Sequence, residues 1–140
     1  MDTDIEQFQI SVKLVLHNKA GDVLVLQAHD GDFTGPWDLP GGRINKDEVS
    51  LNMSEIIHRE IEEEIGAIEY TLDEQPKAVG KATKIDGTST MYLIFEGNYL
   101  EGEVRISTEH RSYKWVKLEN INPTELFANG LLEAIINYLA

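Results

Sequence analysis

The 140-residue chain contains no cysteine and no long apolar run. Without cysteine it can form neither a disulfide framework nor a zinc or iron–sulfur site with thiolate ligands. No segment approaches the roughly 18 apolar residues that a membrane-spanning helix needs. The N-terminus also lacks the basic start and apolar stretch of a signal peptide. We therefore expect a cytoplasmic protein that has no membrane partner.

Basic residues are scarce. Twelve lysines and arginines stand against 25 acidic residues, which gives a formal net charge of −13. Such a surface repels phosphate backbones, so a nucleic-acid polymer is not an expected partner. A small phosphorylated ligand stays compatible with this charge if cations screen its approach. The length and the ordinary shares of hydrophobic (41%) and charged (26%) residues predict a single globular domain over residues 1–140.

Alternating and apolar segments predict a sheet, and one amphipathic segment predicts a helix at Met53–Ile65 that ends at Gly66. Asn122 and Pro123 suggest the start of a second helical region that runs to Leu139 and breaks near Gly130. The order strands, helix, strands, helix predicts an α+β fold, a mixed sheet with helices packed on it. The expected strands are residues 8–17, 23–26, 67–72, 77–85, 89–99 and 112–117.

The first helix has an unusual arrangement of acids. At about 100° per residue, Glu60, Glu63 and Glu64 share about 100° of arc and overlap the apolar stripe, whereas Glu62 lies across the helix. Like charges this close repel one another, and a neighbouring core adds a desolvation cost. A bound Mg²⁺ or Mn²⁺ would relieve both costs. The alternative is a solvated acidic face with ion pairs, which suits Glu62 beside Arg59.

Two glycines precede this helix. Gly41 and Gly42 follow the short extended segment Trp37-Asp38-Leu39-Pro40. Glycines at such a position let the backbone turn tightly and approach a ligand or an ion. The alternative is an ordinary turn after Pro40.

Together these segments resemble the Nudix box, G-x5-E-x7-R-E-U-x-E-E-x-G-U, in which U is a bulky apolar residue. The matching residues are Gly42-x5-Glu48 and Arg59-Glu60-Ile61-x-Glu63-Glu64-x-Gly66-Ala67, with Ala67 small for its position. Ten residues separate Glu48 from Arg59 where the pattern has seven, which we interpret as a three-residue insertion within residues 49–54. This spacing leaves open whether Glu48 or Glu55 pairs with Arg59.

The resemblance implies a Nudix-type α/β/α sandwich. It also implies a metal-dependent hydrolase that cleaves a phosphoanhydride bond in a nucleoside diphosphate linked to another group. In the family's terms, Arg59 orients the glutamates, and Gly42, Glu48 and Gly66 are structural positions of the motif. A further acid commonly acts as base or metal ligand; we choose Glu109, with Glu96 as the competing candidate. The implied ligands of Mg²⁺ or Mn²⁺ are Gly41 through its carbonyl, Glu60, Glu63 and Glu64.

The substrate class follows from what the chain lacks relative to the family. Pro76 comes too early for the proline marker of ADP-ribose hydrolases, and the signature of coenzyme A hydrolases is absent. This favours a MutT-type (d)NTP pyrophosphohydrolase, acting as a monomer or homodimer. The alternatives are a dinucleoside polyphosphate hydrolase, a Nudix-fold binding or sensor domain without turnover, and an acidic interaction domain with no nucleotide ligand.

Two residues are candidates for contact with the base. Phe33 could stack on it or belong to the core, and Trp37 and Tyr92 could also stack but are better explained as core residues. Asn129 lies in an Ala-Asn step that is similar to one in MutT-type enzymes, where the amide meets the purine edge. Its alternative role is the N-cap of a helix over residues 130–139.

Overall fold

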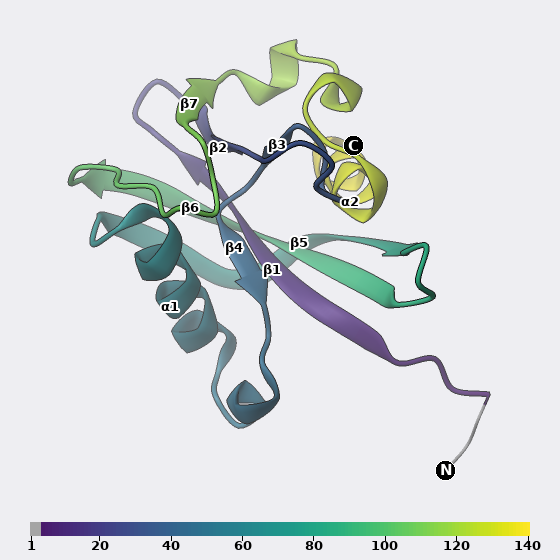
Figure 1. Cartoon of the computed structure of the whole chain (residues 1–140). Coiled ribbons are helices and arrows are strands. Elements are labelled where there is room, and N and C mark those ends of the chain that lie inside the picture. Colours follow the sequence, from purple (N-terminus) through teal and green to yellow (C-terminus); the bar gives the residue numbers. More distant parts are fainter. Residues whose placement is uncertain (1–3) are drawn as a thin grey trace.

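The computed structural model describes residues 4–140 and places two helices on opposite faces of a seven-stranded sheet (Figure 1). The helices are α1 (Met53–Ile65) and α2 (Asn129–Leu139), and none within the described range is long and apolar enough to cross a membrane. Short 3₁₀ helices cover Lys46–Glu48, Leu118–Asn120 and Pro123–Glu125. The strands are β1 (Phe8–His17), β2 (Val23–Gln27), β3 (Trp37–Asp38), β4 (Gly41–Arg43), β5 (Glu69–Thr83), β6 (Ser89–Glu101) and β7 (Tyr113–Val116).

The sheet is mixed, as the α+β expectation requires. Its main path runs β3-β2-β1-β6-β5, while β4 pairs with β1 and β7 pairs with β2. Strands β1 and β6 are parallel, and the other pairs are antiparallel. Because Lys13 lies opposite Gly41 and Val12 opposite Gly42, the centre of β1 holds the glycine pair next to the middle of the sheet.

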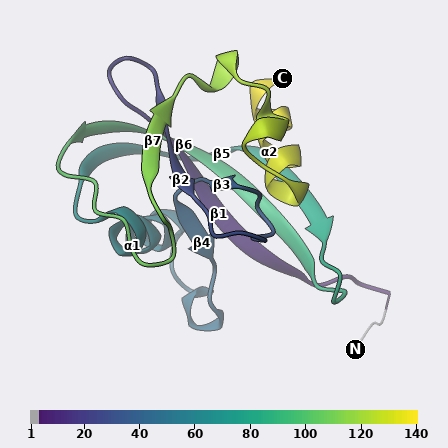
Figure 2. The same ribbon diagram turned by 45° about the horizontal axis from the view of Figure 1, so that its top comes forward.

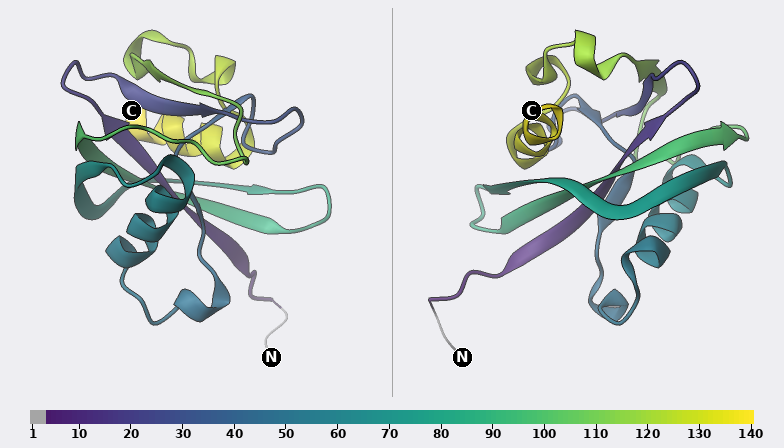
Figure 3. Two further views of the ribbon diagram at one scale, coloured as in Figure 1. Left: turned by 60° about the vertical axis from the view of Figure 1, so that its left-hand side comes forward. Right: turned by 180° about the vertical axis from the view of Figure 1, so that it is seen from behind.

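Each helix closes its own hydrophobic core, which gives the three layers of an α/β/α sandwich (Figures 2 and 3). Alternation along β1 decides which side chain joins which core. Leu14 and Leu16 pack toward α1, where they meet Ile61, and Val15 packs toward α2, where it meets Leu131. The α/β/α layers that the resemblance implies are therefore confirmed.

The two strands expected at residues 67–72 and 77–85 form one long strand, β5. Pairing with β6 is interrupted between Asp73 and Ala78 and then resumes. Pro76 lies in this interruption, and because proline has no N–H to donate, a bulge is the usual way to keep it within a strand. The sequence therefore predicts the break in pairing but not the continuity of the strand.

The C-terminal helical region is divided. Asn122 caps only the 3₁₀ turn, where its side chain accepts from the Thr124 N–H, and α2 begins at Asn129 with a φ of 55°. The N-cap of α2 is Ala128, so the expectation that Asn129 caps this helix is wrong. A left-handed backbone is tolerated by asparagine better than by most residues, which explains its place at the break.

Candidate active site

A pocket of about 550 Å³ opens beside α1, β1 and β4. Its wall is acidic on the helix side, while the opposite rim comes from the loop before β3 and from the β5–β6 hairpin. The residues that line it include Lys13, Phe33, Asp38, Gly41, Gly42, Arg43, Arg59, Glu60, Glu63, Glu64, Lys84 and Glu109.

The acidic residues of helix α1 that line the pocket differ in how deeply they are buried. Glu60 and Glu64 are 8% and 4% exposed, interleaved with the core isoleucines, while the Glu63 side chain is 61% exposed at the rim. Glu62 is exposed and does not line the pocket. This burial agrees with the helical projection. Asn52 caps the helix by accepting from the Glu55 N–H, and Gly66 ends it with a φ of 90°.

Arg59 contacts three glutamates of the motif. Its Nε and Nη2 atoms both donate to the Glu48 carboxylate, Nη2 lies 2.8 Å from Glu60 Oε1, and Nη1 lies 3.2 Å from Glu63 Oε2. The pairing lowers the pKa of Glu48. Glu55 instead accepts from the Asn52 side chain. Of the two partners that the sequence left open, Glu48 is the one that pairs with Arg59.

Residues 49–51 explain how Glu48 keeps this contact despite the longer spacing. The Leu51 N–H donates to the Glu48 carbonyl, so the extra residues form a tight turn after the 3₁₀ helix. Val49 is 81% exposed and makes no part of the core. The turn leaves the Glu48 carboxylate facing Arg59 from outside the pocket.

Deleting residues 49–51 is expected to leave turnover nearly unchanged, because the deletion spares the cap residue Asn52 and every side chain that lines the pocket. The measurement is the steady-state rate of the deletion variant relative to the full chain, with circular dichroism to verify folding. A folded variant without activity would mean that the extra turn belongs to the substrate site.

Gly41 and Gly42 place backbone directly against two of the glutamates. The Gly41 N–H donates to Glu64 Oε1 at 3.0 Å, and its φ of 135° is open to glycine alone among common residues. A Cβ atom on Gly42 would lie 2.3 Å from Glu60 Oε2. The glycine pair is therefore required by the close approach to α1, which favours its role in the site over that of an ordinary turn.

A buried chain of charges lies beneath the pocket. Lys13 Nζ is 3.0 Å from Asp38 Oδ1, and His110 lies between Asp38 and Glu64, with its Nε2 3.6 Å from Asp38 Oδ2 and its Nδ1 3.6 Å from Glu64 Oε2. Lys13, Asp38 and Glu64 come from three different secondary-structure elements, and His110 from the loop before β7. Lys13, Asp38 and His110 were not predicted as site residues. The one signal for them was a lysine in the apolar run of β1.

Burial controls the charge states here. It raises the pKa of Glu64 to about 7 and also raises that of Glu60. Burial acts against the Lys13–Asp38 pair as well, but the attraction between its members outweighs it, so the pKa of Asp38 falls and that of Lys13 rises. Glu64 thus carries its charge at a cost that no neighbouring side chain fully offsets.

In protein freed of divalent ions, Glu64→Gln is expected to be more stable than the parent chain at pH 8. The pKa of Glu64 lies near 4.5 in the unfolded chain and at about 7 in the fold, so ionising it destabilises the fold as the pH rises through this window. The difference should approach about 2–3 kcal/mol above pH 7 and vanish below pH 4.5. Urea unfolding of both proteins at pH 4.5 and at pH 8 measures this difference in the free energy of unfolding. If parent and variant were equally stable at both pH values, the Glu64 carboxylate would not be buried as a charge.

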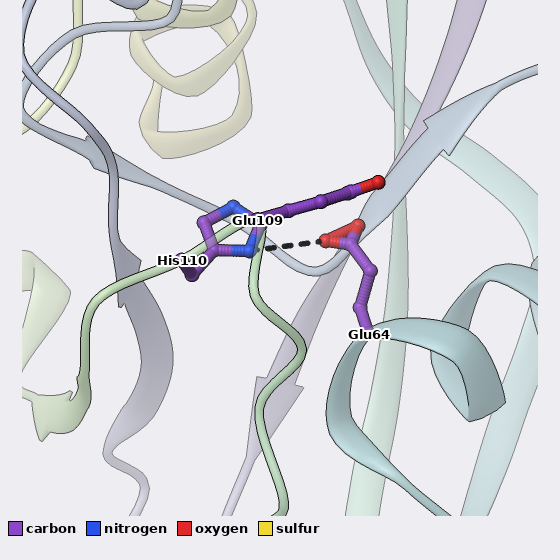
Figure 4. Close-up of side chains that lie close together, drawn as sticks. All are labelled: Glu64, Glu109 and His110. Atoms are coloured by element: carbon purple, nitrogen blue, oxygen red, sulfur yellow. Dashed lines mark ion pairs between the residues drawn. The ribbon is translucent and has the colours of Figure 1, made fainter.

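The residues fit a divalent cation. Glu64 Oε2 and His110 Nδ1 are buried without a hydrogen-bond partner among residues 4–140. Ligand atoms of Glu64, Glu109 and His110 all lie within 4.8 Å of one another, and Figure 4 shows these three side chains converging from α1 and from the loop before β7. A cation would supply the charge and the partners that these atoms lack.

The other predicted residues are placed as follows. Glu109 lines the pocket, whereas Glu96 on β6 lies 3.8 Å from His17 and does not. Phe33 lines the pocket rim, with Lys84 Nζ 5.6 Å from its ring centroid. Asn129 lies behind the rim, and its Nδ2 donates to the Phe33 carbonyl at 2.7 Å.

The two expected core aromatics behave as such. Trp37 packs on the α2-side core with Lys114 Nζ 4.2 Å from its ring centroid. Tyr92 is 4% exposed in the same core and reaches the pocket only at its edge.

Comparisons with known proteins identify the family of the chain. The family model described as NUDIX domain matches residues 7–135. The nucleoside triphosphatase NudI of Escherichia coli O139:H28 is 31% identical over 116 residues, which cover 76% of this chain and 80% of that protein. The chain therefore belongs to the Nudix hydrolase family, and it is an enzyme of the pyrophosphohydrolase type.

Solved structures share the fold. The MutT protein from Methanosarcina mazei Go1 aligns with a TM-score of 0.69 and 28% identity over 96% of this chain and 91% of that one. A C. elegans Ap4A hydrolase binary complex aligns with a TM-score of 0.65 and 23% identity over 80% and 82% of the two chains. The NUDIX domain of Shewanella oneidensis NrtR, complexed with ADP ribose, aligns with a TM-score of 0.65 and 16% identity over 100% and 94%. The α/β/α sandwich is thus shared with proteins whose names give different ligands.

Proposed function

We propose that this enzyme hydrolyses nucleoside triphosphates, ribo or deoxy, to a monophosphate and pyrophosphate with Mg²⁺ or Mn²⁺. The observation that carries the proposal is the Glu64 carboxylate. It faces the pocket, it is almost fully buried, and one of its oxygens has no partner in the described part of the chain. A carboxylate kept in that state suits a cation and the anionic substrate that the cation brings with it.

Glu60, Glu63 and Glu64, with the carbonyl of Gly41, are the groups that would hold the cation. Bound there, it would neutralise phosphate charge, polarise a phosphoryl oxygen and lower the pKa of a coordinated water. Residues of the chain would position the glutamates and accept the proton. Arg59 fixes Glu60 and Glu63 in place through its three contacts. Glu109 also lines the pocket, where it can accept a proton from the attacking water or bind the cation.

The pocket also offers cations for the phosphates. Arg43 and Lys84 both line it, and within residues 4–140 neither forms an ion pair with a carboxylate. In a chain of net charge −13, two uncommitted cations at one pocket favour an anionic ligand. A volume of about 550 Å³ also falls within the usual range for small-molecule sites. The name of the NudI relative, a nucleoside triphosphatase, supports the triphosphate class.

A phosphate-release screen tests the proposal. The purified chain is incubated with a panel of ribo- and deoxynucleoside triphosphates, dinucleoside polyphosphates and ADP-ribose, with Mg²⁺, with Mn²⁺ and with a chelator. We expect turnover of triphosphates above the other classes, and none in the chelator. Preferential cleavage of dinucleoside polyphosphates would replace triphosphates as the substrate class. Tight nucleotide binding without any turnover would indicate a sensor domain.

Asn129→Gly is expected to raise KM about fivefold for every nucleotide, because it removes one hydrogen bond, worth about 1 kcal/mol, that anchors Phe33. Glycine keeps the left-handed backbone of the start of α2. Steady-state kinetics with purine and pyrimidine triphosphates make the measurement. If the variant instead loses about 1–3 kcal/mol of discrimination for one base, Asn129 reads the base directly, as its resemblance to the MutT-type step suggests.

A further inference from the structure

His110 is the one nitrogen donor at a site otherwise made of carboxylates. Its side chain is 6% exposed, and its Nδ1 atom has no hydrogen-bond partner in the described range. Glu64 Oε2, which forms an ion pair with this Nδ1 atom at 3.6 Å, also lacks a hydrogen-bond partner in the described range. This separation exceeds the 2.7–3.2 Å of an N–H···O hydrogen bond. Two donors bound about 2.1 Å from one ion lie roughly 3.0–3.5 Å apart, which is close to the observed spacing.

The residues around His110 orient its ring so that Nδ1 can bind a metal ion. Its Nε2 faces Asp38 Oδ2 at 3.6 Å, and Asp38 is held by Lys13 at 3.0 Å. An anionic Asp38 favours the proton on Nε2, which leaves the lone pair of Nδ1 directed toward Glu64. A histidine whose far nitrogen faces a buried carboxylate is the usual arrangement of an imidazole that binds a metal. The Lys13–Asp38 pair thus orients the ring of His110.

Glu109 completes the group. Its carboxylate, the Glu64 carboxylate and an imidazole nitrogen of His110 all lie within 4.8 Å of one another (Figure 4). Glu64 and His110 are buried, whereas Glu109 is exposed and reaches in from the pocket side. The set therefore has two buried donors and one exposed donor that lines the pocket.

We propose that Glu64, Glu109 and His110 form a mixed nitrogen–oxygen cation site that prefers Mn²⁺ and similar transition-metal ions to Mg²⁺. Imidazole suits transition metals, while Mg²⁺ prefers oxygen ligands alone. The site shares Glu64 with the oxygen donors Glu60 and Glu63, and it rests on the proposed function in that α1 must bind a cation. It adds a consequence that the glutamates alone do not give: the identity of the metal is chosen by His110.

Pulsed electron paramagnetic resonance of the full chain loaded with Mn²⁺ alone tests this site. We expect modulation from a directly bound ¹⁴N nucleus in the parent chain and in the control His58→Gln, whose histidine is exposed and hydrogen-bonded to Tyr70. We expect none in His110→Gln. Calorimetric titration should show Mn²⁺ affinity at least about tenfold weaker in His110→Gln, with Mg²⁺ affinity changed less than about threefold.

The outcomes separate this inference from the function beneath it. Mn²⁺ bound to the parent chain without nitrogen modulation would overturn the His110 site and leave the glutamate site standing. Modulation that persists in His110→Gln would overturn it as well, because another nitrogen would be the ligand. If neither Mn²⁺ nor Mg²⁺ bound the parent chain, the proposed metal-dependent function would fail with it. Should His110→Gln not fold, His110→Ala takes its place, and a parent-chain spectrum without nitrogen modulation overturns the site in either case.

Discussion

Glu64→Gln is expected to lower kcat with Mg²⁺ by about 10³-fold, the equivalent of the several kcal/mol of transition-state stabilisation that a catalytic metal supplies. Glutamine keeps the shape of the side chain and can still accept from the Gly41 N–H. It cannot supply the charge that binds the cation. Because Glu64 is the most deeply buried acid of the pocket, no nearby water or side chain replaces it.

Glu62→Gln is the matched control for this loss. It makes the same substitution two residues away on the same helix, but at an exposed position outside the pocket. Its kcat is expected to stay within about twofold of the parent, as for a surface charge. Steady-state rates on the best triphosphate compare the two. Similar losses in both variants would contradict the assignment of catalysis to one face of α1.

Lys13→Met is expected to destabilise the protein by about 3–5 kcal/mol, because it leaves Asp38 charged and buried without its cation. The Lys13 side chain is 6% exposed, and that of Asp38 is 11% exposed. His110 lies 3.6 Å from Asp38 and offers only a weaker replacement. In a domain of this size the loss corresponds to a melting temperature lower by about 10 °C or more, which calorimetry measures.

Lys117→Met provides the comparison for the buried pair. Lys117 pairs with Asp22 at 2.9 Å, but the Lys117 side chain is 50% exposed. Exposed pairs contribute about 0–1 kcal/mol, so this variant should melt close to the parent. In the double variant Lys13→Met/Asp38→Leu, part of the stability should return because the unpaired charge is gone. Equal effects of the two lysine substitutions would show that the Lys13 pair is not buried in solution.

Local patterns predict the parts of this site that lie on regular elements. The 3.6-residue period of α1 places Glu60 and Glu64 on the buried side and Glu62 outside, since a helix fixes the direction of each side chain. Alternation along residues 8–17 predicts a strand with one apolar face in the same way. The glycine pair is predictable too, because only glycine lets β4 approach the carboxylate of Glu60.

The charge network beneath the pocket is not predictable in this way. Asp38 and His110 lie far apart in the chain, and they meet because β3 and β7 both pair with the end of β2, where Leu26 lies opposite Asp38 and Tyr113. No period or motif reports a contact made by two irregular segments. Asn129 is a similar case: the Ala-Asn step is visible in the sequence, but its contact with Phe33 depends on how a distant loop folds back.

The proposed hydrolysis to monophosphate and pyrophosphate is tested most directly by the quantity of each product that forms from a triphosphate with Mg²⁺. Chromatography of the nucleotides and a coupled pyrophosphate assay measure these quantities. We expect one pyrophosphate for each monophosphate, with both products abolished by a chelator and formed about 10³-fold more slowly by Glu64→Gln. Release of diphosphate and inorganic phosphate, or turnover that survives complete removal of divalent ions, would contradict it.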